Sequence, residues 1–269
     1  MSFTEKYGPW ALVTGASEGT GREFARRIAA LGLPSVLVAR RQAPLDELAE
    51  QIATETGVEC VTASIDLAAS DADAQVLAAV GDREIGLFVA NAGADPNHSR
   101  FLDAELDAWN ALAQRNDMTG MRLCHHLGRA MRERRRGGIL LVNSGACYGG
   151  GAGLAVYSAS KAFELNLAES LWVELREFDV DVLALVLGMT DTPAFRTWLA
   201  EQGWQVPQGI ASPAEVAEVG LDRLPHGPVH NWGQADDEQG FMPTSAAVRR
   251  ERVVFLTEMS AVAFTEVDD

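Results

Sequence analysis

The chain has 269 residues, of which 47% are hydrophobic, and a formal net charge of −16. The length suits one α/β domain with a packed core, and the negative charge argues against a nucleic-acid partner, whose phosphates bind basic side chains. No apolar run approaches the roughly 20 residues that cross a bilayer, and the first ten residues lack a secretory signal pattern. We therefore expect a cytoplasmic protein with no membrane partner.

Cysteines and histidines give no sign of a disulfide framework or a metal site. Cys60, Cys124 and Cys147 are widely spaced and form no CxxC pair. Only two of the five histidines lie four residues apart, and Gly227 and Pro228 stand between them, which excludes a helical pair of ligands. We expect no bound metal.

Short apolar, β-branched runs alternate with longer amphipathic stretches along the chain. This alternation is typical of βα units around a parallel sheet, and strands that are apolar throughout indicate helices on both faces. Strands are expected at residues 10–14, 35–39, 59–65, 85–91, 139–144, 180–187 and 228–232. Helices are expected at residues 19–31, 45–56, 72–80, 106–135 and 155–178. The predicted fold class is α/β, with a doubly wound parallel sheet of about seven strands.

Two segments interrupt this alternation. Residues 188–210 carry aromatic and aliphatic side chains beside two prolines, and residues 231–244 form a polar loop before a last helix at 245–264. Neither segment has the composition of a linker, so residues 1–269 are expected to form a single domain with a helical extension from about residue 244.

The first strand leads into Thr14-Gly-Ala-Ser-Glu-Gly-Thr-Gly21 and then into a helix. Glycines permit a tight turn and a close approach of the backbone to a pyrophosphate, and the free amides of a helix N-terminus attract that anion. Glycines alone would also suit an ordinary turn, but their place between strand and helix favours dinucleotide binding.

The end of the second strand bears on the choice of dinucleotide. An acidic residue there would bind the ribose hydroxyls of NAD, but Ala39 is followed by Arg40 and Arg41. Arginine suits the 2′-phosphate of NADP, although Glu18 in the glycine loop acts against it. NADP is therefore favoured, with NAD as the alternative.

A candidate catalytic pair opens the predicted helix at 155–178. The chain has three tyrosines and only two lysines, Lys6 and Lys161, and Lys161 stands four residues after Tyr157, on the same helix face. A nearby ammonium favours a phenolate and makes tyrosine a usable acid and base near neutral pH. The spacing predicts a catalytic Tyr157 tuned by Lys161.

Several motifs in the same order resemble the short-chain dehydrogenase/reductase family over roughly residues 8–195. They are the glycine loop, Asp66-Leu67, Asn91-Ala-Gly93, Asn116, Ser144 and Tyr157-Ser-Ala-Ser-Lys161, with Ser144 at the family spacing of 13 residues before the tyrosine. The resemblance implies a single-domain Rossmann fold and hydride transfer between a nicotinamide and a carbonyl or alcohol. Thr20, Ala90 and Leu187 depart from the usual isoleucine, asparagine and proline, without removing a reacting group.

The resemblance also implies a role for each catalytic residue. Tyr157 would exchange a proton with the substrate oxygen, to which Ser144 would donate a hydrogen bond. Lys161 would bind the nicotinamide ribose, and Asn116 would hold a water that relays protons. Expected cofactor contacts are Gly15, Ser17, Glu18, Gly19, Thr20, Gly21, Arg40, Arg41, Asp66, Leu67, Asn91, Ala92, Gly93, Tyr157, Lys161, Gly188, Thr190 and Thr192.

The family places its substrate lid after the sixth strand, where residues 188–210 are rich in apolar side chains. The hypothesis is therefore an NADP(H)-dependent enzyme that interconverts a ketone with a steroid, aryl or long-chain skeleton and its secondary alcohol. Two alternatives remain: an NAD-dependent secondary-alcohol dehydrogenase and a non-catalytic dinucleotide-binding sensor. The resemblance further implies a homodimer or homotetramer.

Overall fold

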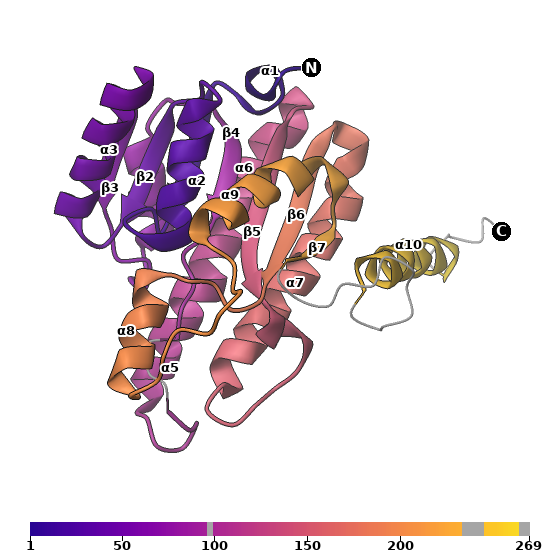
Figure 1. Cartoon of the computed structure of the whole chain (residues 1–269). Coiled ribbons are helices and arrows are strands. Elements are labelled where there is room, and N and C mark those ends of the chain that lie inside the picture. Colours follow the sequence, from indigo (N-terminus) through magenta and orange to yellow (C-terminus); the bar gives the residue numbers. More distant parts are fainter. Residues whose placement is uncertain (96–98, 233–244, 264–269) are drawn as a thin grey trace.

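Seven parallel strands form one sheet in the computed structural model, which describes residues 1–95, 99–232 and 245–263. Their order is β3-β2-β1-β4-β5-β6-β7 (Figure 1). The strands are β1 (Trp10–Thr14), β2 (Ser35–Ala39), β3 (Cys60–Ser64), β4 (Ile85–Ala90), β5 (Gly137–Ser144), β6 (Val180–Leu187) and β7 (Val229–Trp232). From β1 the chain adds β2 and β3 on one side, and then returns to add β4 to β7 on the other side of β1. The strand order therefore reverses between β1 and β4, which confirms the predicted doubly wound fold.

Helices cover both faces of this sheet. One face carries α2 (Gly19–Ala30), α3 (Gln42–Thr56) and α9 (Pro213–Arg223), and the other carries α4 (Ala72–Val80), α6 (Thr119–Arg134) and α7 (Ala155–Leu175). Alternate strand residues enter the two cores: Val13 packs with Phe24 of α2, whereas its neighbour Leu12 packs on the opposite side. This period of two explains why each central strand is apolar along its whole length.

The predicted helix at 106–135 is interrupted. It consists of α5 (Leu106–Ala113), a π-helical turn η1 (Gln114–Met118) and α6. The amphipathic pattern runs through all three segments. The π turn η1 has one residue more than an α-helical turn, but this extra residue left no signal in the hydrophobic periodicity. The prediction of one continuous helix was therefore wrong at the turn that carries Asn116.

Three helices lie outside the predicted set: α1 (Phe3–Tyr7), α8 (Pro193–Glu201) and α9. Capping boxes start two of them, Ser2 with Glu5 at α1 and Ser212 with Glu215 at α9, where Pro213 takes the first helical position. These are local signals that the sequence displays, since a serine followed three residues later by glutamate satisfies the first free amides of a helix.

The final helix lies beside β7, at one edge of the sheet (Figure 1). Asn231 and Trp232 belong to β7, not to the predicted loop, whose residues 233–244 fall outside the described residues. The final helix, α10 (Ala246–Ala263), joins α7 through Arg249, whose Nη2 donates to Glu169 Oε2 at 3.0 Å. Within the described ranges, no helix combines the length and apolar character needed to cross a membrane.

Close packing of α1 on β4 gives a test of this arrangement. A Cβ at Gly86 would lie 2.3 Å from the carbonyl oxygens of both Tyr7 and Gly8, whereas a Cβ at Gly120 in α6 would meet nothing within 4 Å. Gly86→Ala should lower the free energy of unfolding by about 2–3 kcal/mol through overpacking. Gly120→Ala, the matched control, should raise it by roughly 0.5–1 kcal/mol. Urea unfolding measures both, and equal midpoints would contradict the close contact.

Candidate active site

A cleft of about 510 Å³ lies where the chain leaves β1, β2, β3 and β4. Its lining includes these predicted cofactor residues: Gly15, Ser17, Glu18, Gly19, Thr20, Arg40, Arg41, Asp66, Leu67, Asn91, Ala92, Gly93 and Thr192. In open α/β sheets, ligands bind at the carboxyl ends of the strands beside the point where the strand order reverses. The cleft occupies this position.

The glycine loop is held from the neighbouring strand. The Asn91 side-chain amide, just after β4, donates to the carbonyl oxygens of Thr14 and Gly15, each at 3.2 Å. Thr20 Oγ1 donates to Asn91 Oδ1 at 2.6 Å. A Cβ at Gly21 would lie 2.2 Å from Gly15 O, so only glycine lets α2 begin this close to the loop. The structure thus places the side chain of Asn91, a predicted cofactor contact, against the loop.

The two arginines after β2 differ in their surroundings. Arg41 Nη2 donates to Glu18 Oε2 at 2.6 Å, in an ion pair whose two side chains are both exposed. Glu18 thus neutralises one of the two positive charges predicted to favour NADP. Arg40 lines the same cleft.

Residues 188–192 are anchored to β7 and to the turn before α9. Gly188 N donates to Trp232 O at 2.9 Å, and Asp191 N donates to Ala211 O at the same distance. Thr192 Oγ1 accepts from Phe195 N at 3.1 Å and so caps α8. A Cβ at Gly19 would lie 3.2 Å from Thr192, so the start of α8 packs against the glycine loop. Five predicted cofactor contacts are not among the residues that line the cleft: Gly21, Tyr157, Lys161, Gly188 and Thr190.

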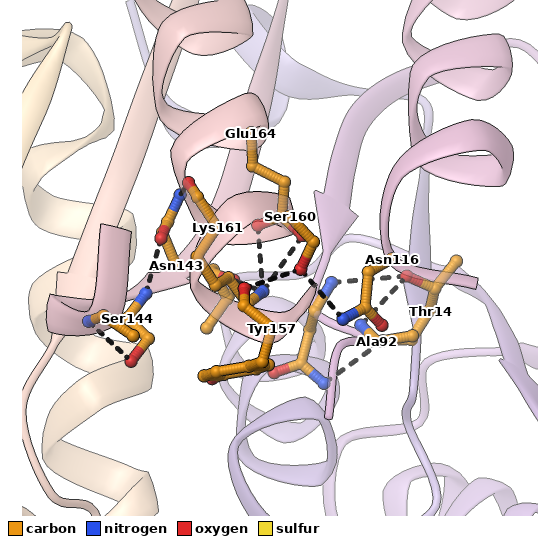
Figure 2. A network of polar contacts seen from close by, with 12 residues as sticks. Thr14, Ala92, Asn116, Asn143, Ser144, Tyr157, Ser160, Lys161 and Glu164 are labelled. Atoms are coloured by element: carbon orange, nitrogen blue, oxygen red, sulfur yellow. Dashed lines mark hydrogen bonds and ion pairs between the residues drawn. The ribbon is translucent and has the colours of Figure 1, made fainter. Parts of the chain in front are cut away.

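The four predicted catalytic residues come from three elements, and Figure 2 shows their side chains in one region. The region borders the cleft, because Gly93, which faces Lys161, is part of the cleft lining. Ser144 ends β5, Tyr157 lies in the first turn of α7 with Lys161 one turn later, and Asn116 lies in the π turn η1. Tyr157 is partly exposed, whereas Lys161 and Asn116 are only 2% and 3% exposed. The π turn directs Asn116 inward, a distortion that is frequent at functional sites.

Asn116 is anchored on one side only. Its Nδ2 donates to Ser160 Oγ at 3.2 Å, and Ser160 Oγ donates to the carbonyl oxygen of Tyr157 at 2.9 Å. Its Oδ1 is buried and has no hydrogen-bond partner among the described residues. A cavity of about 20 Å³ beside it has room for one water molecule. These features fit the water-holding role that the family resemblance implies.

Lys161 is enclosed by protein on every side that the structure describes. Its Nζ donates to Val142 O at 3.2 Å and to the two carboxylate oxygens of Glu164 at 3.0 and 2.9 Å. Nζ lies 5.9 Å from the centre of the Tyr157 ring. Burial lowers the pKa of the ammonium, but Glu164, together with Tyr157 and Asp117, outweighs burial, so the pKa of Lys161 lies above its ordinary value. A Cβ at Gly93 would lie 2.6 Å from Nζ, so the glycine makes room for the ammonium.

The structure adds residues that the motifs did not indicate. Arg115, next to Asn116, lines the cleft, and burial together with the nearby Arg40 lowers the pKa of its guanidinium. Asp117 is half-buried, and burial raises the pKa of its carboxyl to about 6. Glu164 follows Lys161 by three residues, about one helical turn. This spacing was the one signal in the sequence that could have indicated their pairing. The π turn concealed the direction of Arg115 and Asp117.

No group of three or more histidine, cysteine or acidic side chains is placed to hold a metal ion in the part of the chain that the structure describes. The polar groups at the site are instead a phenol, a hydroxyl, an amide and an ammonium. Such groups can move a proton to or from an oxygen beside a dinucleotide cleft. The fold and site together define a nucleotide-dependent α/β oxidoreductase.

Comparison with known proteins identifies the family. The profile of the short chain dehydrogenases matches residues 9–203. The chain is 32% identical over 229 residues to a 7beta-hydroxysteroid dehydrogenase of Clostridium sardiniense, covering 83% of this chain and 85% of that protein. It is 29% identical over 226 residues to the 7beta-hydroxysteroid dehydrogenase of Mediterraneibacter gnavus, covering 83% and 86%. The chain belongs to the short-chain dehydrogenases, NAD(P)-dependent oxidoreductases that act on CH–OH groups.

Solved structures agree with this assignment. A 7beta-hydroxysteroid dehydrogenase studied for its stereoselectivity superposes with a TM-score of 0.82 at 28% identity, covering 94% of this chain and 100% of that one. A short-chain dehydrogenase from Sphingobium yanoikuyae in complex with NADPH superposes with a TM-score of 0.74 at 26% identity, covering 97% and 98%.

The raised pKa of Asp117 predicts a pH-dependent stability. Because the carboxyl pKa rises from 3.8 to about 6 on folding, the carboxylate opposes folding above pH 6, and this cost disappears below about pH 4. Asp117→Asn should therefore raise the free energy of unfolding at pH 8 by about 1 kcal/mol, after a discount for partial exposure to solvent, and little at pH 4. Urea unfolding at both pH values tests this expectation. Asp107→Asn, at an exposed position of α5, controls for the lost charge, and equal gains at both pH values would contradict the prediction.

Proposed function

We propose that this protein is an NADP(H)-dependent oxidoreductase that interconverts a bulky, apolar ketone and its secondary alcohol. The observation that carries the proposal is the meeting of Tyr157, Lys161, Ser144 and Asn116 next to a cleft lined by the glycine loop. We also propose that residues 1–269 form one NAD(P)-binding domain, with a substrate lid at about residues 188–210 and a helical extension at about residues 244–264.

The proposed chemistry divides between cofactor and protein. The nicotinamide, when bound, supplies the hydride in reduction and accepts it in oxidation. In reduction, Tyr157 Oη gives its proton to the carbonyl oxygen of the substrate. Ser144 Oγ accepts a hydrogen bond from Ala146 N at 3.3 Å, which leaves its own proton to donate to the same substrate oxygen. The Lys161 ammonium stabilises the phenolate that remains, and a water on Asn116 Oδ1 connects the site to solvent.

The proposal of NADP as cofactor rests on charge at the end of β2. Ala39 leaves this position without an acidic side chain, and Arg40 lines the cleft. Two similar structures contain this cofactor: the Sphingobium yanoikuyae enzyme with NADPH, and a serine dehydrogenase with NADP+ at 26% identity. The ion pair between Arg41 and Glu18 favours the NAD alternative, because it neutralises one of the two arginines after β2. Arg40 is the other, and it has no ion pair with the described residues.

Exposed apolar side chains in three segments support a bulky substrate. They are Phe101, Leu102, Leu106, Leu154, Met189, Trp204 and Val206. They belong to the segments around α5, before α7 and around α8, which lie at one end of the molecule (Figure 1). In the lid, Trp198 packs against Phe195 and Trp204, with ring centres 5.9 and 5.4 Å away. Grouped apolar side chains at a surface mark a binding site, and hydroxysteroids are the first substrates to test.

Copies of the chain are proposed to pair as a homodimer or homotetramer through α6 and α7. The outer faces of these helices border a groove that includes His125, Arg129, Arg132 and Glu174. The cytoplasmic location remains a prediction.

Replacement of Tyr157 tests the proposed reaction. Tyr157→Phe should reduce turnover at least roughly 100-fold, because the proton donor is lost, while NADPH binding measured by fluorescence persists. Turnover is followed by absorbance at 340 nm, with ketones graded by size and polarity for reduction. Alcohols, hydroxysteroids among them, are used for the reverse direction. Tyr7→Phe is the control, since Tyr7 Oη bonds Asp181 at 2.7 Å away from the site. A preference for small polar ketones would overturn the substrate assignment, and NADPH binding without turnover would favour the sensor alternative.

Arg40→Asp tests the cofactor assignment. Loss of a charge-assisted contact to the 2′-phosphate should weaken NADPH binding about 10- to 100-fold and leave NADH binding nearly unchanged. The control is Arg26→Asp in α2, because Arg26 pairs with Glu55 of α3 and does not line the cleft. If both dinucleotides lose affinity equally, Arg40 does not select the phosphate.

A further inference from the structure

The family motifs assign no role to Glu164, yet it is the closest charged partner of Lys161. The two residues lie one turn apart on α7, and both carboxylate oxygens are within 3.0 Å of Lys161 Nζ. Their side chains are 3% and 9% exposed. Figure 2 shows both carboxylate contacts directed at the lysine behind Tyr157.

A buried pair of this kind has an energetic reason. An ammonium taken out of water loses several kcal/mol of hydration, and an isolated buried lysine releases its proton instead of remaining charged. Besides Glu164, the structure offers Nζ the carbonyl oxygen of Val142, at 3.2 Å. One neutral acceptor does not replace the hydration of a charge.

Other titratable groups surround the pair. Asp117 of η1 acts on both Lys161 and Glu164, while Cys124 of α6 and Cys147 of the 3-10 turn η2 (Gly145–Tyr148) face Glu164. Burial raises the pKa of both thiols to about 12, so they stay neutral. Burial also raises the pKa of Glu164 to about 7, against the effect of the ammonium, so Glu164 is a carboxylate in mildly alkaline solution. Tyr157, on the same helix, also acts on Lys161 and raises the pKa of its ammonium.

We propose that Glu164 is a positioning residue that keeps Lys161 protonated and fixes its ammonium behind Tyr157. The consequence for catalysis rests on the function proposed above, whereas the charge state of Lys161 does not. Without the carboxylate, the buried lysine becomes a neutral amine near neutral pH. Tyr157 then lacks the cation that stabilises its phenolate, although each of the four family residues is still present.

The small number of lysines permits a direct test. Lysine labelled with 13C at Cε gives two signals, because Lys6 and Lys161 are the only lysines, and Lys6→Arg assigns them. In the cofactor-free protein, the wild-type Lys161 signal should remain that of an ammonium up to pH 10. In Glu164→Gln its titration midpoint should fall by roughly three pH units or more, to near neutral pH. Glu164→Asp, which retains the charge, should restore much of the difference, and Glu177→Gln, at an exposed position just after α7, should change nothing.

Catalysis supplies a second measurement. Alcohol oxidation requires the Tyr157 phenolate, so in Glu164→Gln the rise of kcat/KM with pH should shift to higher pH. A merely structural defect would lower kcat/KM at every pH without shifting the pH at which it rises. An unchanged Lys161 titration in Glu164→Gln would overturn the proposal, as would a wild-type Lys161 that is already neutral at pH 8. If Glu164→Gln does not fold, the proposal is judged from the Lys161 titrations of the wild type and of Glu164→Asp. Because the NMR titration needs neither cofactor nor substrate, its outcome is separate from that of the proposed function.

Discussion

The parallel pairing of β1 with β4 is the constraint on which the site depends. Thr14 lies opposite Ala90 in this pairing, so the glycine loop and Asn91 leave the sheet side by side. Asn91 can then reach the carbonyl oxygens of Thr14 and Gly15 and hold the loop open toward the cleft. A slip of one residue in this register would turn every side chain to the opposite face. The shape of the cleft therefore depends on the sheet as much as on the glycines.

A second set of contacts joins β5 to α7 and determines where the proton chemistry takes place. Asn143 Nδ2 donates to the carbonyl oxygen of Lys161 at 2.9 Å, and Lys161 Nζ donates back to Val142 O. These bonds fix the first turns of α7 against the end of β5. Ser144 and Tyr157 thus sit on two rigid elements that are tied together, as precise positioning of reacting groups requires.

Much of the fold could be predicted because its signals are local. Strands β1, β2 and β6 begin and end at the predicted residues, since a buried parallel strand is a short apolar run with polar residues at its ends. The capping box at Ser212 is just as local, but the prediction did not use it and therefore missed α9. The π turn differs in kind: an extra residue in an amphipathic helix leaves the pattern of apolar side chains almost intact, so the direction of Asn116 could not be obtained from periodicity.

By itself, the sequence determined the order of the strands and of the longer helices along the chain, the glycines of the loop, and the spacing of Tyr157 and Lys161 on one helix face. Only the tertiary structure decided which polar groups become partners. Asn116 bonds Ser160 across 44 residues, and Arg41 bonds Glu18 across 23. Even the pair of Lys161 and Glu164, close in sequence, owes its importance to the layers that exclude water from it. Backbone preference and hydrophobic periodicity act over a few residues, whereas burial depends on every segment packed against a group.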